Sequence, residues 1–204
     1  MNITEWEAFL RQESQKAISA YLEEKDSGNP DLWEDIELEQ EIIDSGWLGL
    51  EGALEREIVA TEELLEINLP PSYRNFLRVT NGWNTENPEL IHLYSVQEVC
   101  WFRDQHQDWI DIWVNSEAIL DRIPDAEYFV YGKDQEPSQI REDYLQTALK
   151  ISTVYDGDVV LLNPQIIVDG EWEAWIFSNS SCGAHRYESF SNMLKLKGLS
   201  DSWL

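Results

Sequence analysis

The first third of the chain has hydrophobic residues at helical spacing. From Trp6 to Tyr21 apolar side chains recur at helical spacing, and Gly28-Asn29-Pro30 ends the pattern. Thr4 and Glu7 have the spacing of a capping box. The sequence therefore predicts a helix that begins at Thr4 and ends before residue 28. Further helices are predicted over residues 31–46, over residues 54–66, and from Pro71 to about Thr80, where Asn81-Gly82 supplies a left-handed exit.

A different pattern begins after Gly82. Short runs of β-branched and aromatic residues predict strands at 128–131, 151–155, 159–162, 166–168 and 172–177. Turn residues separate them at Asp156-Gly157-Asp158, Asn163-Pro164 and Asp169-Gly170. The last three strands are close enough for an antiparallel meander, and a closing helix is expected after Ser189. Helices that precede strands, with few βαβ alternations, predict an α+β fold.

The charge of the chain excludes several classes of function. Its 204 residues include 40 Asp and Glu but only 14 Lys and Arg, which gives a net charge of −26. Such a chain repels phosphates and anionic lipids, so nucleic acid and membrane surfaces are excluded as partners. No apolar run approaches the roughly 18 residues that a membrane span needs, and the acidic start lacks the regions of a signal peptide. We expect a cytoplasmic protein.

Acidic residues are densest between Asp31 and Glu41. The first 66 residues hold 19 acidic and 4 basic side chains. Lysines therefore do not alternate with the acids, and the repulsion between the acids is not relieved locally. Solubility of a small domain needs a net charge of only about 2–8 in magnitude. The excess of negative charge predicts a basic protein partner. The alternative interpretation is that the acidic stretch is simply a solvated face of a helix. The candidate partner-binding residues in this stretch are Glu34, Asp35, Glu37, Glu39 and Glu41.

Tryptophan beside acidic residues is a second unusual feature. The chain has ten tryptophans, of which several stand next to carboxylates in the sequence. Tryptophan is a frequent anchor at protein interfaces, and surrounding acids would suit a partner rich in lysine and arginine. Together with two turn acids, these positions complete the candidate partner-binding set: Asp108, Asp111, Asp156, Asp158, Glu171, Trp172 and Glu173.

Two groups of residues could carry chemistry. Glu171 and Glu173 would share one face of a strand, and two carboxylates near an aromatic ring resemble a glycosidase site. In a chain with 40 acids such a pair also arises by chance. Four possible zinc ligands, Cys100, His106, Cys182 and His185, lack the paired spacing of standard zinc motifs. Nucleophile and phosphate-binding motifs are absent from the sequence, so we predict no catalytic residues, no metal and no cofactor.

Several separate blocks of the sequence resemble a known family. The blocks are Gly46-Trp47-Leu48-Gly49, residues 69–77, Asn81-Gly82-Trp83, residues 128–132, residues 161–164, residues 170–175 and residues 183–190. In this order they are similar to the SUKH superfamily, and more narrowly to its branch named after fungal cell-wall-assembly regulators. The similarity covers roughly residues 46–195. We therefore expect a SUKH-like domain over 46–204, with residues 1–45 as an acidic helical extension packed on the same domain.

The resemblance implies a mixed, largely antiparallel sheet flanked by helices and a protein without catalytic residues. Bacterial members of the superfamily are similar to immunity proteins, which neutralise a cognate polymorphic or contact-dependent toxin, frequently a nuclease. This implication agrees with the basic partner expected from the charge. Two alternatives stay open: a non-catalytic cellular scaffold or regulator, and a hydrolase that uses Glu171 and Glu173.

Overall fold

A five-stranded antiparallel sheet lies in the middle of the fold. In the computed structural model, which describes residues 1–27, 38–83, 91–115 and 122–199, the strands lie side by side in chain order. Each pairing among these strands is antiparallel. The α+β class predicted from the sequence is confirmed. The strands are β1 (Cys100–Trp101), β2 (Leu149–Lys150), β3 (Asp158–Val168), β4 (Glu171–Ser178) and β5 (Gly183–Tyr187).

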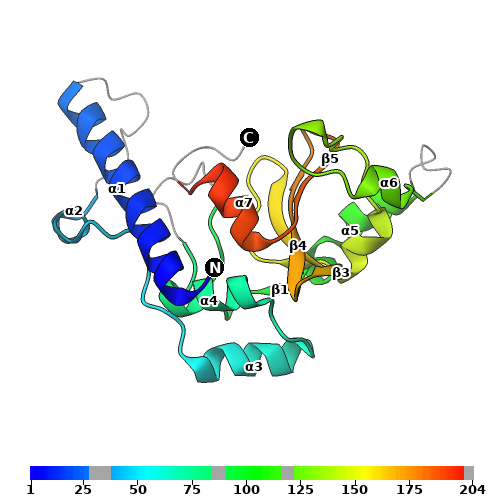
Figure 1. Ribbon diagram of the computed structural model, residues 1–204, viewed down its shortest axis with the longest axis horizontal. Helices are drawn as coiled ribbons and strands as arrows, with labels where there is room; N and C mark the ends of the chain where they lie inside the picture. The colour runs from blue at the N-terminus through cyan, green and yellow to red at the C-terminus, as the bar shows by residue number, and fades with distance from the viewer. Residues whose placement is uncertain (28–37, 84–90, 116–121, 200–204) are drawn as a thin grey trace.

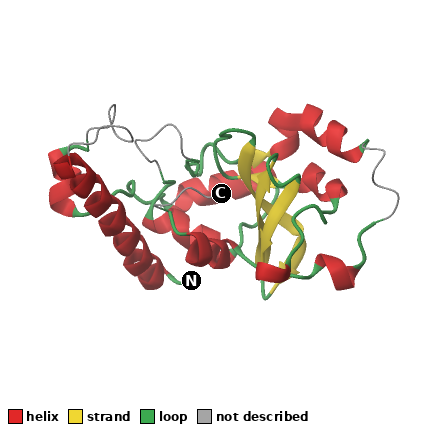
Figure 2. Cartoon of the chain, turned by 90° about the horizontal axis from the view of Figure 1, so that it is seen from above, coloured by secondary structure: helices red, strands yellow, loops and turns green. Residues whose placement is uncertain are grey.

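Helices cover both faces of the sheet (Figures 1 and 2). One face packs against α1 (Ile3–Ser27), α3 (Glu55–Leu65), α4 (Pro71–Val79) and α7 (Phe190–Lys197). The other packs against α5 (Phe102–Val114), α6 (Asp125–Tyr128) and the 3-10 helix η2 (Glu142–Thr147). The short helices α2 (Gln40–Ser45) and η1 (Gly132–Asp134) complete the described elements.

The side chains of β4 show why the strand is apolar on both faces. Trp172, Ala174 and Ile176 face the core beneath α4 and α7, whereas Trp175 and Phe177 face the core beneath α5. Successive residues of a strand point to opposite faces, and both faces here are covered. A strand buried on both sides reads as a nearly continuous apolar run rather than an alternating one.

The first half of α1 belongs to the main core. Trp6 is fully buried, its ring lies 5.4 Å from that of Phe76 and 5.6 Å from that of Phe190, and its Nε1 donates to the carbonyl oxygen of Ser72 at 2.8 Å. Farther along, Glu13 accepts a 2.8 Å hydrogen bond from the amide of Leu199. The helix is therefore held by contacts with α4, with α7 and with the segment after α7.

The helix predictions are largely confirmed where the structure describes the chain. α1, α3, α4 and α7 lie close to their predicted bounds, and the side chain of Ser189 accepts from the amide of Asn192 at the start of α7. The predicted helix over 31–46 is observed only as α2, and residues 28–37 lie outside the described residues. Ser95 and Glu98 form hydrogen bonds with each other that close a turn, and α5 begins after them at Phe102.

Three predictions made for the region of the strands are wrong. Residues 128–131 form no strand, because Pro124 starts the short helix α6 and Tyr128 turns its ring into the core. The predicted turn at Asn163-Pro164 lies inside β3, which runs from Asp158 to Val168. The register shifts between Asn163 and Ile167, so proline occupies a bulge, where a strand tolerates it. The predicted strand 151–155 is not formed: β2 ends at Lys150, just before it, and within 151–155 only isolated bridges occur, at Ser152 and Tyr155.

The outer edge of β5 is covered by the loop that follows α6. The Gln135 side chain acts like a neighbouring strand: its Oε1 accepts from the amide of Arg186 at 2.7 Å, and its Nε2 donates to the carbonyl of Arg186 at 2.9 Å. The amide of Ala184 donates to the carbonyl of Pro137 at 2.9 Å. A Cβ atom at Gly183 would lie 2.0 Å from that carbonyl oxygen, so the close approach requires glycine there.

Candidate protein-binding groove

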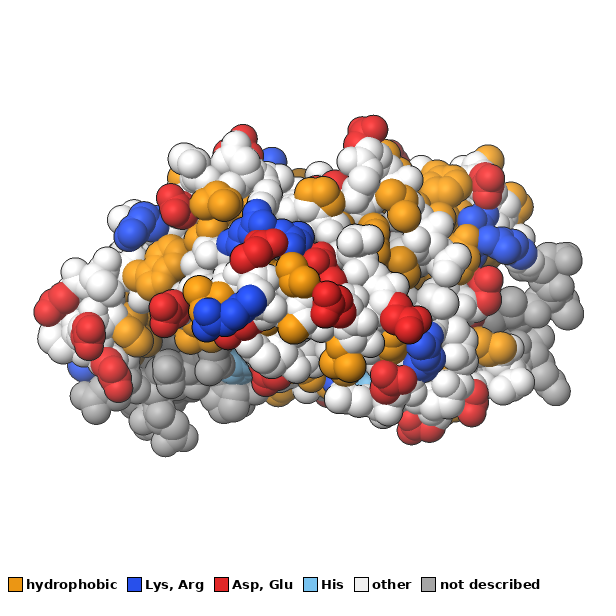
Figure 3. All heavy atoms as spheres, turned by 90° about the horizontal axis from the view of Figure 1, so that it is seen from below, with side chains coloured by type: hydrophobic (Ala, Val, Ile, Leu, Met, Phe, Trp, Pro, Cys, Tyr) orange, Lys and Arg blue, Asp and Glu red, His pale blue; other side chains and the backbone are white. Residues whose placement is uncertain are grey.

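The acidic residues predicted to bind a partner do not form one cluster. Glu34, Asp35 and Glu37 lie outside the described residues. Exposed positions are Glu39 and Glu41 at the start of α2, Asp108 and Asp111 on α5, and Asp156 in the turn before β3. On the face shown in Figure 3, carboxylates are spread over the surface among hydrophobic side chains.

Asp158 differs from its neighbour Asp156 because its side chain is buried. Only 1% of the residue is exposed, and its Oδ1 has no hydrogen-bond partner among the described residues. Desolvation raises the pKa of the Asp158 carboxyl, and the nearby charge of Asp156 adds to the effect. Asp158 therefore belongs to the packing between β3 and the end of β4 and is not an exposed contact residue.

Glu171 holds the start of α4. Its two carboxylate oxygens accept from the amide of Ser72 at 2.9 Å and from the hydroxyl of Ser72 at 2.6 Å. The first amides of a helix lack intrahelical acceptors, and a carboxylate there is favoured by the helix dipole. Trp172, the next residue, is buried in the core on the α4 side.

Glu173 is the acceptor of a buried hydrogen-bond network. Its carboxylate accepts from the hydroxyls of Tyr128 (2.6 Å) and Tyr131 (2.9 Å), from the side-chain amide of Asn163 (2.9 Å) and from the indole of Trp175 (2.7 Å). Burial and this carboxylate raise the pKa of both tyrosines. Glu171 and Glu173 thus bind different partners, and neither carboxylate is free in the way a glycosidase acid or nucleophile needs to be.

The four possible zinc ligands are not brought together. Cys100 is on β1, at one edge of the sheet, whereas Cys182 is exposed in the turn before β5, at the other edge. Among the residues that the structure describes, no group of three or more His, Cys, Asp or Glu side chains is placed to hold a metal ion. None of the described helices has the length and apolar character to cross a membrane.

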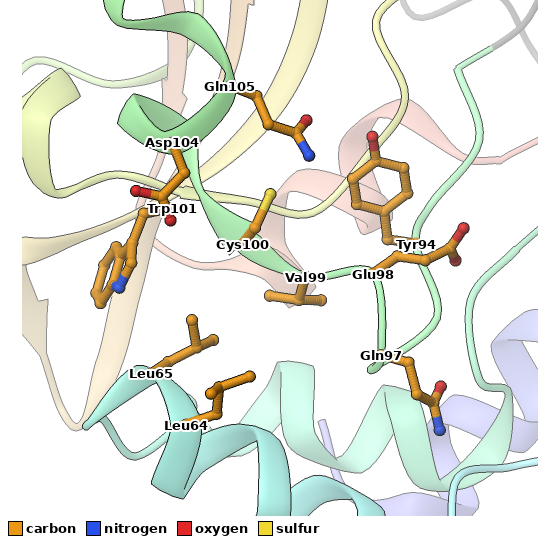
Figure 4. Close-up of a pocket in the computed structure, with 10 residues that line it drawn as sticks. All are labelled: Leu64, Leu65, Tyr94, Gln97, Glu98, Val99, Cys100, Trp101, Asp104 and Gln105. Carbon is orange, nitrogen blue, oxygen red and sulfur yellow. The ribbon is translucent and has the colours of Figure 1, made fainter.

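An open groove of about 670 Å³ lies beside β1 (Figure 4). Leu64 and Leu65, from the end of α3, line one side of it. Asp104 and Gln105, from the first turn of α5, lie across from them, and the thiol of Cys100 lies between the two sides. Leu64 is 81% exposed, an unusual position for so large an apolar side chain. The groove therefore has an apolar wall and a polar wall.

The groove follows the edge of the sheet. It is lined by Val99, Cys100 and Trp101, which are consecutive residues. In an extended chain Cys100 points to one face, and its two neighbours point to the other. A groove lined by all three must pass along the edge of β1, with α3 on one side of the sheet and α5 on the other.

The carboxylates at the groove are only weakly neutralised. Glu98 accepts two hydrogen bonds from Ser95, and no lysine or arginine among the described residues lies within ion-pair distance of it. Asp104 lies 3.8 Å from Nε of Arg103, and both side chains are about half exposed, so this pair contributes little. Arg103 also lies over the ring of Trp101, 5.0 Å from its centroid. The rim of the groove can accept a further cation.

Buried polar side chains fix α5 beside the groove. Lys150 is 3% exposed; its Nζ donates to Oε1 of Gln105 at 2.9 Å and lies 3.0 Å from Nε2 of His106. An ammonium has only donors, so Nε2 of His106 must be the acceptor. Burial and then the charge of Lys150 lower the pKa of His106, and burial lowers the pKa of Lys150. The helix departs from regular geometry at His106 (φ −136°, ψ 37°).

Sequence reasoning missed the groove. The sequence signal that could have indicated it is Leu64. The inward face of α3 carries Ile58, Thr61 and Leu65, and Leu64 lies outside that face. An apolar residue outside the inward stripe of a helix is a candidate contact residue. The remaining lining residues come from the segment 94–99, from β1 and from the first turn of α5, and the sequence patterns predicted no strand at β1.

The sheet, its two helical layers and the edge groove define an α+β domain suited to protein binding. The profile of the SMI1 / KNR4 family (SUKH-1) matches residues 52–196, which is more than half of the chain. The chain therefore belongs to this family, and the resemblance read from its sequence is confirmed. The matched part begins after α1 and α2. A comparison with curated proteins gives no match.

Proposed function

We propose that this protein is an immunity protein that binds a cognate basic toxin, such as a nuclease, and neutralises it without catalysis. The observation that carries the proposal is the groove beside β1, where the exposed Leu64 faces the acidic rim of Asp104 and Glu98. The net charge of −26 supports a basic partner, because opposite charge steers association. Membership of the SUKH-1 family supports a toxin as that partner.

The direct test is co-expression with the product of the adjacent upstream gene. We expect that product to be toxic alone, to be harmless when the two proteins are expressed together, and to co-purify with this protein in a one-to-one complex. If the neighbouring gene product is not toxic, or if its toxicity persists on co-expression, this protein is not its immunity protein. That result would favour the alternative function, a scaffold or regulator.

The same complex provides an electrostatic test. The Debye length falls from about 10 Å at 0.1 M salt to about 3 Å at 1 M. Over that range we expect the association rate to fall by at least about tenfold, with a smaller change in the dissociation rate. Stopped-flow association rates that stay constant would show that the negative charge does not steer this partner.

A further inference from the structure

The two edge strands of the sheet, β1 and β5, differ in what lies beside them. The outer edge of β5 is paired with the side chain of Gln135 and with the carbonyl of Pro137. The outer edge of β1 borders the groove instead. Proteins commonly cover or blunt the edge strands of a sheet, because an open edge recruits another strand. An edge left beside a groove is therefore a place where a strand can be added.

The hydrogen-bond register shows which backbone group is directed outward. Trp101 pairs with Leu149 and Cys100 with Lys150, and the amide of Phe102 donates to the carbonyl of Ala148 at 2.9 Å. Hydrogen-bonded and non-hydrogen-bonded pairs alternate along an antiparallel ladder. The Trp101 pair is consequently of the non-hydrogen-bonded kind, and the amide N–H of Trp101 points away from β2, toward the open edge.

The two walls of the groove match the two faces of an added strand. Alternate side chains of such a strand would point toward α3 and toward α5. On the α3 side they would meet Leu64 and Leu65, and on the α5 side they would meet Asp104 and Gln105. The complementary segment alternates apolar residues with lysine or arginine.

We propose that the groove binds an extended segment of the partner that alternates basic and apolar residues, by adding it as a strand to β1. A carbonyl of the segment accepts from the amide of Trp101, its basic side chains face Asp104, and its apolar side chains cover Leu64. Strand addition of this kind derives affinity from main-chain hydrogen bonds and specificity from alternate side chains. The inference rests on the proposed function for its partner, and it assigns the contact surface.

Short peptides test, without the toxin, whether the groove requires a basic segment and whether basic and apolar residues must alternate in it. The probes are eight-residue peptides with blocked ends: alternating Lys and Val, alternating Glu and Val, and four Lys followed by four Val. Backbone NMR of the full chain should show saturable shifts at Val99, Trp101 and Leu64 with the alternating Lys–Val peptide. We expect much weaker shifts with the block peptide and none with the acidic one. No shifts at millimolar Lys–Val peptide, or equal shifts with the acidic peptide, would overturn the proposal.

A pair of substitutions at one position tests the backbone contact. Trp101→Ala removes the side chain and keeps the amide, whereas Trp101→Pro removes both. Proline fits here because φ of Trp101 is −67° and the preceding residue is in a strand. Loss of one net hydrogen bond should make the peptide dissociation constant about twofold to tenfold higher for Trp101→Pro than for Trp101→Ala. Equal constants in two variants with the same circular dichroism would exclude pairing through this amide.

A second pair of variants covers the possibility that Trp101→Pro unfolds the protein. Leu64→Lys places a cation in the groove at a highly exposed site, and Leu196→Lys is its control on α7, where the leucine is 65% exposed. Leu64→Lys should abolish Lys–Val binding and weaken toxin rescue, and Leu196→Lys should change neither. If wild type rescues and Leu64→Lys rescues equally well, the groove assignment is wrong and the immunity function stands. If the peptide binds as expected but wild type gives no rescue, the immunity function fails and the groove assignment stands.

Discussion

The carboxylate of Glu173 lies 3.5 Å from the guanidinium of Arg186, and neither side chain is exposed to solvent. Arg186 also donates to the carbonyl of Tyr128 and lies over the ring of Tyr128, 4.2 Å from its centroid. Two of its nitrogens, Nε and Nη2, have no hydrogen-bond partner among the described residues. Because both charged groups are removed from water, each is stabilised mainly by the opposite charge of the other.

Removing one charge of this pair should destabilise the fold strongly. Glu173→Gln keeps the size of the side chain but leaves the charge of Arg186 buried without its counterion. We expect a loss of about 3–5 kcal/mol in the free energy of unfolding, measured by urea denaturation. Glu188→Gln, at an exposed position just after β5, is the control and should change stability little. A loss below about 1 kcal/mol for Glu173→Gln would show that the buried pair is not needed.

Trp6 should connect α1 to the stability of the whole domain. Trp6→Phe retains an aromatic ring but loses the indole hydrogen bond to the carbonyl oxygen of Ser72, which should cost about 0.5–1.5 kcal/mol. Trp6→Ala also leaves a cavity against Phe76 and Phe190 and should cost about 3–5 kcal/mol. Urea unfolding followed by circular dichroism measures both, with the exposed Glu7→Ala as control. If α1 frayed separately, the unfolding curve would show two transitions instead of one.

Reversing exposed acidic pairs should weaken neutralisation without unfolding the protein. The paired variants are Glu39→Lys with Glu41→Lys on α2, and Asp108→Lys with Asp111→Lys on α5. Exposed charges at a rim act mainly on the association rate, so we expect at least one pair to slow association by about tenfold at low salt. Surface plasmon resonance with the cognate toxin measures this, and thermal unfolding verifies the fold. Full protection and unchanged rates in both variants would place the contact surface elsewhere.

His106 should make stability depend on pH. Burial and the charge of Lys150 lower its pKa, so the folded protein binds a proton less readily than the unfolded chain. The corresponding stability is present above the unfolded pKa of about 6.5 and is lost as pH falls below it toward the folded pKa. Between about pH 7.5 and pH 5.5, wild type should therefore lose more unfolding free energy than His106→Gln, in which this proton is absent. Equal losses in both proteins would contradict a neutral His106.

Local signals predicted the parts of the fold that local chemistry decides. Pro71 and Ser189 mark the starts of α4 and α7, and Asp169-Gly170 marks the hairpin between β3 and β4, where both residues have positive φ. Residues 128–131 look like a strand by composition, but Tyr128 is placed by its hydrogen bond to Glu173, which lies 45 positions away. Propensity cannot anticipate a partner so distant in the chain.

The candidate site was less predictable than the fold for a related reason. Acid next to tryptophan in sequence indicated Glu171 and Glu173 as binding residues. In the structure these carboxylates accept hydrogen bonds from Ser72, Tyr128 and Tyr131. Burial of a charged group depends on tertiary packing, which a run of residues does not reveal. The groove, in turn, depends on the edge position of β1, and that position is set by pairing with β2, about 50 residues later in the chain.

The asymmetry of the sheet edges has a consequence for assembly size. A sheet with two open edges can be extended from both ends, and identical copies can then stack into fibres. Here Gln135 and Pro137 cover one end, so the sheet of one molecule can be extended only at β1. Copies of this chain can therefore pair once through β1 but cannot stack into a fibre through their sheet edges. The acidic chain could then accumulate in excess over its partner without polymerising.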